Sequence, residues 1–223
     1  MKILIISLLS IITIGIMAPT VSGEIFVSEE ELHPFTIEYP SNWKIVSIEP
    51  ITKGGIMIDS DKTGRNGMWI GFWKNIVNIN YEDSELLEFQ KNSIKKFCVN
   101  STHEKHFGEC SNLIFQTNKI QDIDESRSAT SIMKYEWLIE KPDPTFEDST
   151  TGKFSTIDTL TWIPSGNDIW IIATTNNSDK FDEKQIHEII HSFKFKNIDN
   201  SPPELQSKYW HDTIIDFLKS LFR

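Results

Sequence analysis

The chain has 223 residues, of which 39% are hydrophobic and 24% charged, and its formal net charge is −10 at pH 7. This length suits one domain with a full core, and the seven Trp and fourteen Phe exclude a disordered chain. An acidic surface repels phosphate groups, which argues against nucleic-acid binding and against flat docking on anionic lipid headgroups.

The N-terminal segment has the pattern of a secretory signal. Lys2 supplies a positive start, and residues 3–18 form an apolar run that Pro19 ends. Residues 21–23 then offer a cleavage site before Glu24. The run is shorter than the roughly 20 residues that span a bilayer comfortably. We therefore expect a secreted or extracytoplasmic protein. The alternative is a retained N-terminal anchor, which would keep the domain at the cell surface.

An acidic lead-in is expected at residues 24–32, followed by alternating strand patterns. Phe35, Ile37 and Tyr39 alternate with polar residues, as in a half-buried strand. Further strands are expected at residues 43–46, 56–58, 68–73, 112–117, 128–139, 154–163 and 169–175, the last two as a hairpin. Phe72 and Trp73 should then lie on opposite faces of their strand.

Two helices are expected inside the domain and a third after it. Asp83 or Ser84 caps an amphipathic helix, and Asp179 or Asp182 caps a short one that runs into a strand at residues 192–195. A linker at residues 197–203 precedes an amphipathic terminal helix, which packs on the domain, docks on a partner or contacts a membrane. The expected organisation is a signal (1–23), an α+β domain with a mainly antiparallel sheet flanked by helices (24–196), and a linker with the C-terminal helix (197–223).

Two motifs resemble PsbP-like domains of the Mog1/PsbP fold. One is Tyr39-Pro40-x-x-Trp43 at the end of an aromatic strand, and the other is Ser192-Phe193 after the second helix. The resemblance implies an α/β/α sandwich in which these five residues serve the fold. It also implies an exported, non-catalytic accessory or binding function. The cysteines and the terminal helix lie outside the family's pattern.

Cys98 and Cys110 predict a disulfide, because an even pair in an exported chain is normally oxidised. His103 and His106 lie between them, which leaves two alternatives open. All four residues could hold Zn or Cu, or the two histidines could bind the metal on a loop that the disulfide closes.

A second histidine pair follows the His-Glu-x-x-His pattern of zinc hydrolases. His187 and His191 would share one face of a helix beside Glu188, as metal-assisted hydrolysis requires. The helix is short, however, and it coincides with the terminal helix of the PsbP-like pattern. A purely structural role is therefore the competing interpretation.

Asn100 and Asn176 begin N-x-Ser/Thr sequons and are candidate glycosylation sites.

No residue is assigned a catalytic role. The favoured function is a non-catalytic accessory or binding module whose partner is a secreted or envelope protein, such as a member of an envelope complex. Its rivals are a secreted zinc hydrolase and a copper- or zinc-binding protein, and only these would need a metal. Membrane association is expected only through the C-terminal helix or an uncleaved signal.

Overall fold

The computed structural model describes residues 23–28, 34–48, 55–61, 63, 65–74, 82–103, 109–140, 150–166 and 168–196. For residues 100–103 it describes the backbone only. The expected linker and terminal helix lie outside these residues, as does the expected signal apart from Gly23. The described elements are β1 (Gly23–Val27), β2 (Phe35–Pro40), β3 (Lys44–Ile48), β4 (Ile56–Asp59), β5 (Gly67–Trp73), α1 (Asp83–His103), β6 (Glu109–Ile123), β7 (Ser126–Ile139), β8 (Gly152–Ser165), β9 (Asp168–Asn177), α2 (Glu183–Ser192) and β10 (Lys194–Phe195).

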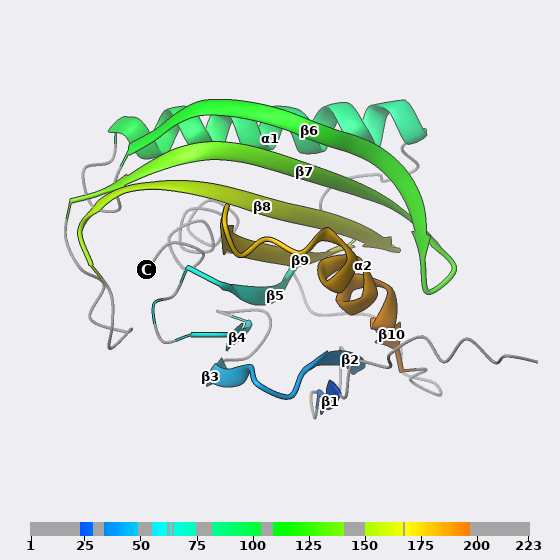
Figure 1. Ribbon diagram of the computed structural model, residues 1–223. Coiled ribbons are helices and arrows are strands. Elements are labelled where there is room, and N and C mark those ends of the chain that lie inside the picture. The colour runs from blue at the N-terminus through cyan, green and yellow to red at the C-terminus, as the bar shows by residue number, and fades with distance from the viewer. Residues whose placement is uncertain are drawn as a thin grey trace, which may run out of the picture.

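Two antiparallel sheets organise these elements. The larger has seven strands in the order β3-β4-β5-β9-β8-β7-β6, and the smaller has three in the order β1-β2-β10. Strands β6, β7 and β8 are long and arch over the rest of the domain, with α1 along the outside of the arch (Figure 1). The mainly antiparallel α+β class expected from the sequence is therefore confirmed.

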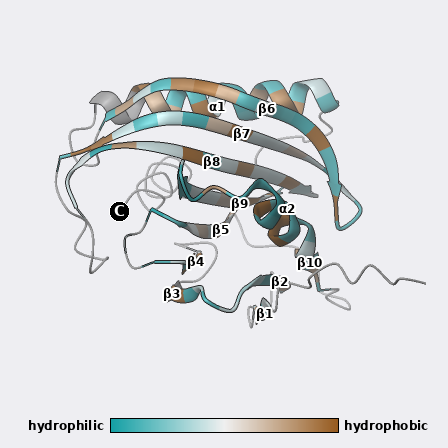
Figure 2. Cartoon of the chain, in the orientation of Figure 1, coloured by the Kyte–Doolittle hydropathy of each residue, from teal (hydrophilic) through white to brown (hydrophobic). Residues whose placement is uncertain are grey.

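Strand β9 shows how the large sheet divides the core into layers. Trp170 and Ile172 belong to the core formed with α2 and the three-stranded sheet, whereas Ile169 and Ile171 belong to the core formed with α1. Successive side chains of a strand point to opposite faces, so both faces of this strand are covered. Hydrophilic and hydrophobic residues alternate along several of the strands (Figure 2). We call these two sides of the sheet the α2 face and the α1 face.

Helix α1 is attached to the sheet by polar contacts as well as by packing. The Glu85 carboxylate accepts a hydrogen bond from the Glu82 backbone at 3.1 Å, which closes the first turn. In the middle of the helix, the fully buried Gln90 amide donates to the carbonyl oxygens of Ala129 and Leu160, both at 3.0 Å. These bonds satisfy a buried amide and fix the helix over β7 and β8.

The β6–β7 hairpin was only partly predictable. The sequence predicted strands at 112–117 and 128–139, but β6 extends to Ile123 and turns directly into β7. The turn residues Asp124 and Glu125 have φ values of 46° and 66°, in a region that favours Gly or Asn. The Asp124 carboxylate accepts a hydrogen bond from the Phe195 backbone at 2.7 Å, so the hairpin tip holds β10.

The expected lead-in at residues 24–32 is corrected at its start, since residues 24–27 belong to strand β1. This strand pairs with β2 along its whole length, from Gly23 opposite Pro40 to Val27 opposite Thr36. Phe26 packs against the main core, and the Tyr39 hydroxyl donates to the Glu24 carboxylate at 2.9 Å. Acidic composition suggested a solvated segment, but Phe26 packs on the core and the exposed Glu24 bonds to Tyr39, so the segment forms a strand against β2.

The motif residues have the structural roles that the resemblance implied. Pro40 ends β2, its carbonyl accepts from the Trp43 backbone at 2.9 Å, and Trp43 is buried. The Ser192 hydroxyl accepts from the Glu38 backbone at 2.8 Å, which ties the end of α2 to β2. Phe193 is fully buried, with its ring centroid 5.4 Å from that of Phe35.

The predicted disulfide is present and joins the end of α1 to the start of β6. Cys98 and Cys110 have Cα atoms 5.2 Å apart, and both side chains are buried in the cluster with Tyr135 and Trp137. The bond closes a loop of 12 residues, so in the chain-entropy model it restricts the unfolded chain by about 2–3 kcal/mol.

We expect Cys98→Ser combined with Cys110→Ser to lower the free energy of unfolding by about 2–3 kcal/mol, because the unfolded chain regains that freedom. Urea denaturation of the purified variant and of the oxidised wild type measures the difference. Reduced wild type is the matched control and should behave as the variant does. Equal stability of all three would contradict the assignment.

Candidate functional site

The His187–Glu188–His191 constellation lies on α2, where the sequence placed it. The imidazole ring centroids are 4.1 Å apart; His187 is exposed and His191 half-buried. Burial lowers the pKa of His191, and the neighbouring His187, Lys119 and Lys194 lower it further. Two lysines beside a histidine repel a cation, so the surroundings do not favour a metal ion.

The remaining requirements of a zinc hydrolase find no support in the part of the chain that the structure describes. Glu188 is exposed, and Lys184 lies 3.5 Å from its carboxylate, one turn earlier on the helix. Among the described residues, no group of three or more His, Cys, Asp or Glu side chains is placed to hold a metal ion. The helix itself is explained by its buried face of Ile186, Ile189 and Ile190 and by its Asp182 cap.

The other histidine pair lies largely outside the described residues. His103 is the last residue of α1, and neither its side chain nor His106 is described. The disulfide leaves Cys98 and Cys110 without free thiols. The alternative in which both cysteines bind a metal as thiolates therefore does not apply to this oxidised state, whereas metal binding by the two histidines stays a prediction.

The two sequons differ in what the structure allows. Asn176 lies in β9 with only 4% of its surface exposed, and its amide nitrogen is buried. In the folded domain this nitrogen is covered, so a sugar would have to be attached before the strand packs, and glycosylation of Asn176 stays a prediction. Asn100 lies in the last turn of α1, where its side chain is not described.

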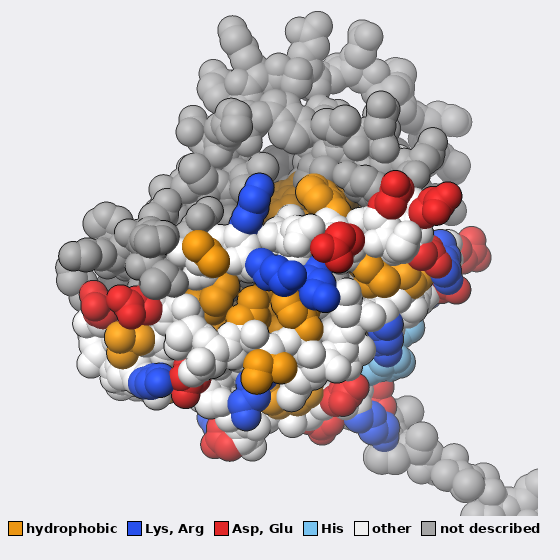
Figure 3. Space-filling model, turned by 90° about the horizontal axis from the view of Figure 1, so that it is seen from above, with side chains coloured by type: hydrophobic (Ala, Val, Ile, Leu, Met, Phe, Trp, Pro, Cys, Tyr) orange, Lys and Arg blue, Asp and Glu red, His pale blue; other side chains and the backbone are white. Residues whose placement is uncertain are grey.

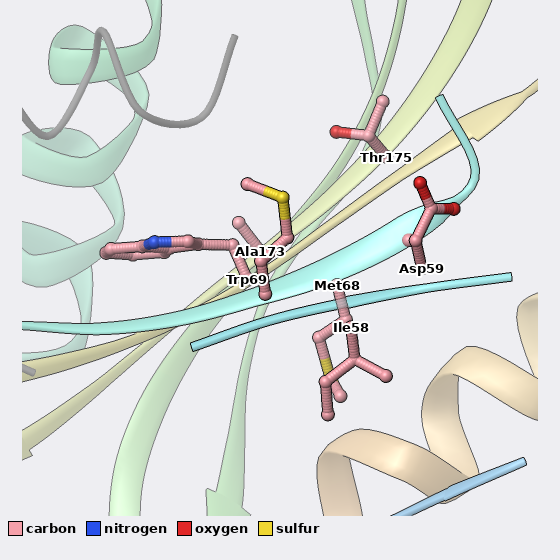
Figure 4. Close-up of a pocket in the computed structure, with 8 residues that line it drawn as sticks. Ile58, Asp59, Met68, Trp69, Ala173 and Thr175 are labelled. Carbon is pink, nitrogen blue, oxygen red and sulfur yellow. The ribbon is translucent and has the colours of Figure 1, made fainter. Parts of the chain in front are cut away.

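The aromatic residues of β5 pack on the sheet. Phe72 belongs to the core on the α2 face and Trp73 packs against the core on the α1 face, so the expected division between faces is confirmed. Trp69 lies flat over Gly71, where an added Cβ would come within 1.6 Å of the indole ring. The indole beside this glycine forms one wall of a small pocket (Figure 4).

This pocket is lined by side chains from β4, β5 and β9. Figure 4 shows Asp59 and Thr175 on one side of the sheet and Ile58 on the other. Gly67 lies between Asp59 and Thr175 in the cross-strand register, where an added Cβ would come within 2.7 Å of the Ile58 carbonyl oxygen. The cavity volume of about 30 Å³ suits a water-sized group rather than an organic substrate.

The cross-strand register that joins Asp59, Gly67 and Thr175 continues to Asp158, a buried acid that the sequence did not predict. Asp158 pairs with Thr175 in the register, and its Oδ2 accepts a hydrogen bond from the buried Tyr135 hydroxyl at 2.7 Å. Burial raises the pKa of Asp158 to about 7, although the bond from Tyr135 acts in the opposite direction. Burial and the nearby carboxylate also raise the pKa of Tyr135. Tyr135 lies on β7 and Asp158 on the next strand, β8, and only the register between neighbouring strands brings the three side chains together.

Six large apolar side chains are exposed among the described residues, and four of them lie on two edge strands; the other two are Val99 on α1 and Ile114 on β6, 58% and 60% exposed. Ile25 and Val27 on β1 are 62% and 45% exposed, and Ile45 and Val46 on β3 are 38% and 41% exposed. We call these four side chains the edge surface. Strands β1 and β3 each end a sheet, and both lie at the lower side of the molecule in Figure 1. Exposed apolar groups on strand edges are typical of protein contact surfaces.

The opposite side of the molecule has a different character. The face that carries α1 and β6 mixes apolar with charged side chains (Figure 3). Lys91, for example, lies over the Phe115 ring, 5.5 Å from its centroid. No helix within the described ranges is both long enough and apolar enough to cross a membrane.

Comparison with known proteins gives similarity of structure only. No family model matches the chain, and no curated protein matches it in sequence. Its structure is similar to the solution structure of cyanobacterial PsbP (CyanoP) from Synechocystis sp. PCC 6803, with a TM-score of 0.49, 9% identity, and coverage of 81% of this chain and 96% of that chain. At this identity the similarity bears on the fold alone.

The chain is also similar to a crystal structure of a protein from Bacteroides thetaiotaomicron VPI-5482. The TM-score is 0.47 and the identity 13%, with 81% of this chain covered. The match covers 51% of that chain, so it spans about half the length of that protein.

The raised pKa of Asp158 makes the free energy of unfolding depend on pH. A folded-state pKa above the unfolded value means that the folded protein binds a proton which the unfolded chain releases. The stabilisation is present below pH 4 and is lost as the pH rises towards 7, by up to about 4 kcal/mol. We expect Asp158→Asn to unfold at higher urea than wild type at pH 8, with the difference disappearing near pH 4.

Asp179→Asn is the matched control, since it removes an exposed carboxylate from the turn after β9. Urea titrations of the three proteins at pH 4, 6 and 8 measure the effect. If Asp158→Asn followed the pH profile of wild type, the buried acid would not titrate in this range.

Proposed function

We propose that the protein is an exported, non-catalytic binding module that attaches to a protein partner of the cell envelope through the edge surface. The observation that carries the proposal is the concentration of four exposed apolar side chains on strands that end their sheets. A large exposed apolar group is costly to keep in water unless a partner covers it.

Strand β1 is the better of the two edges for a partner. Within the described residues it pairs only with β2, so the backbone groups of its other edge face no described strand. Ile25 and Val27 point outward, because Glu24 and Phe26 make the inward contacts. Strand β1 also contains no proline and no register shift, which are common devices that protect edges.

Strand β3 is less open to pairing. Its register with β4 shifts between Ile45 and Ser47, which leaves Val46 as an extra residue at a bulge. A bulge disrupts the regular ladder and twists the edge away from a further strand. We therefore assign backbone pairing to β1 and side-chain contact to β3.

The partner is expected to contribute an extended segment with apolar side chains at alternate positions. Such a segment adds a strand to β1, with affinity from backbone hydrogen bonds and specificity from Ile25 and Val27. The net charge of −10 favours a neutral or basic partner over an acidic one.

We expect Ile25→Lys combined with Val27→Lys to weaken partner binding at least about tenfold, because two ammonium groups replace the apolar contact. The free energy of unfolding should change by less than about 1 kcal/mol, since both side chains are exposed. Cross-linking of the mature protein in envelope fractions identifies the partner. Titration of the isolated partner then gives the dissociation constant.

Val99→Lys is the control, because it places one such ammonium group on an exposed apolar position of α1, away from the edge surface. It should bind the partner as wild type does. Equal binding by the double variant and the control would remove the edge surface from consideration. Binding without turnover supports the proposal, and hydrolysis of a defined substrate contradicts it.

Metal analysis separates this function from the zinc hydrolase. A hydrolase built on His187 and His191 requires zinc in an amount equal to the protein, and its activity would disappear in Glu188→Ala. We expect no stoichiometric zinc in the purified protein, and unchanged partner binding in His187→Ala. Tightly bound zinc that His187→Ala removes would favour the enzyme.

A further inference from the structure

Three polar side chains lie together on the α2 face of the large sheet, in a region otherwise typical of a core. They are Thr159 on β8 and Thr174 and Asn176 on β9, with exposed fractions of 2%, 0% and 4%. Thr174 and Asn176 alternate with the core residues Trp170 and Ile172 on the same strand, so they face the same side.

None of the three makes its full set of hydrogen bonds within the chain. The hydroxyl oxygens of Thr159 and Thr174 and the amide nitrogen of Asn176 are buried without a partner. Nearby hydroxyls on the same face behave differently. The Thr130 and Thr161 oxygens are 3.0 Å apart, and Thr130 also accepts from the Gln121 amide at 2.8 Å.

The register brings the three unpartnered groups within reach of one small molecule. Thr159 lies directly opposite Thr174, and Asn176 follows two residues later on the same strand. Directly opposed side chains have Cβ atoms about 5 Å apart, and residues two apart on one strand are about 7 Å apart. Apolar residues flank the pair of threonines, with Met68 beside Thr174 and Ile132 beside Thr159.

Three buried polar groups without partners would destabilise the fold unless a bound molecule satisfied their hydrogen bonds. A buried polar group without a partner destabilises the fold, whereas Val has nearly the same shape as Thr and no such penalty. Other buried unpartnered atoms, such as Asp158 Oδ1 and Trp162 Nε1, belong to side chains on the α1 face. On the α2 face of β8 and β9, by contrast, three meet at one place.

We propose that Thr159, Thr174 and Asn176 form a binding site for a small uncharged group that both accepts and donates hydrogen bonds. Asn176 donates through its amide nitrogen, so the guest must accept, and the two hydroxyls can serve in either role. The hydroxyl of a bound water or of a small alcohol has this chemistry. The site is separate from the edge surface and does not depend on the proposed partner.

The first test replaces one hydroxyl by a methyl group. If a guest bonds to Thr174, Thr174→Val lowers the folding equilibrium constant by about 5- to 30-fold, because the guest loses a partner. If the hydroxyl has no guest, removing it leaves the constant unchanged or raises it, and the proposal is overturned. Urea denaturation of wild type and variant measures the ratio.

Thr161→Val is the matched control on the same face. Its hydroxyl bonds to Thr130, so its removal shows how much the loss of a satisfied buried hydroxyl reduces the constant in this sheet. Far-ultraviolet circular dichroism and the intact disulfide verify that both variants fold. A loss in Thr161→Val with none in Thr174→Val would exclude the guest without ambiguity.

A second measurement identifies the source of the hydroxyl. Native mass spectrometry of the purified protein shows a small alcohol as added mass that Thr174→Val lacks. Bound water gives no added mass but produces nuclear Overhauser contacts between water and the methyl groups of Thr159 and Thr174. Either result supports the site, and the absence of both overturns it.

Discussion

Strands β8 and β9 bury side chains on both faces, and this double burial determines how the rest of the domain is arranged. Ile169 and Ile171 require cover on the α1 face, and Trp170 and Ile172 require it on the α2 face. Helix α1 supplies the first layer, while α2 and the three-stranded sheet supply the second. The layered arrangement therefore follows from the residue pattern of the two central strands.

Covering both faces also changes the chemistry of any polar residue that the central strands carry. On the α1 face Asp158 becomes an acid that titrates near neutral pH, and on the α2 face threonine hydroxyls lose access to solvent. The edge strands β1 and β3 carry exposed apolar side chains, whereas the two central strands carry the buried ionisable and hydroxyl groups.

Local patterns allowed much of the fold to be predicted from the sequence. Alternation identified β2, the apolar and aromatic run identified β5, a cap at Asp179 or Asp182 identified α2, and the cysteine pair identified the disulfide. The two motifs placed Trp43 and Phe193 in the core. In each case the determining residues are close in sequence, or are so few that only one pairing is possible.

Features that depend on register were not predictable. The β6–β7 turn uses Asp124 and Glu125 in place of the Asn-Gly pair that usually signals a hairpin, so the length of β6 was missed. Asp158 and Tyr135 are 23 residues apart, and the sequence gives no sign that their side chains meet. The alternation of side chains along one strand shows which face of the sheet each residue occupies, but not which residue lies beside it on the next strand.

The pairing of β10 with β2 has a consequence for the order in which the domain forms. Phe195 pairs with Phe35, so the small sheet gains its third strand only when nearly the whole domain is available. The β6–β7 and β8–β9 hairpins and the α1–β6 disulfide join segments close in sequence and form early. In a chain that is synthesised from its N-terminus, Phe35 and Trp170 therefore lack their contact with Phe193 until the segment that ends in β10 has been made. Closure of the core is a late step with high contact order.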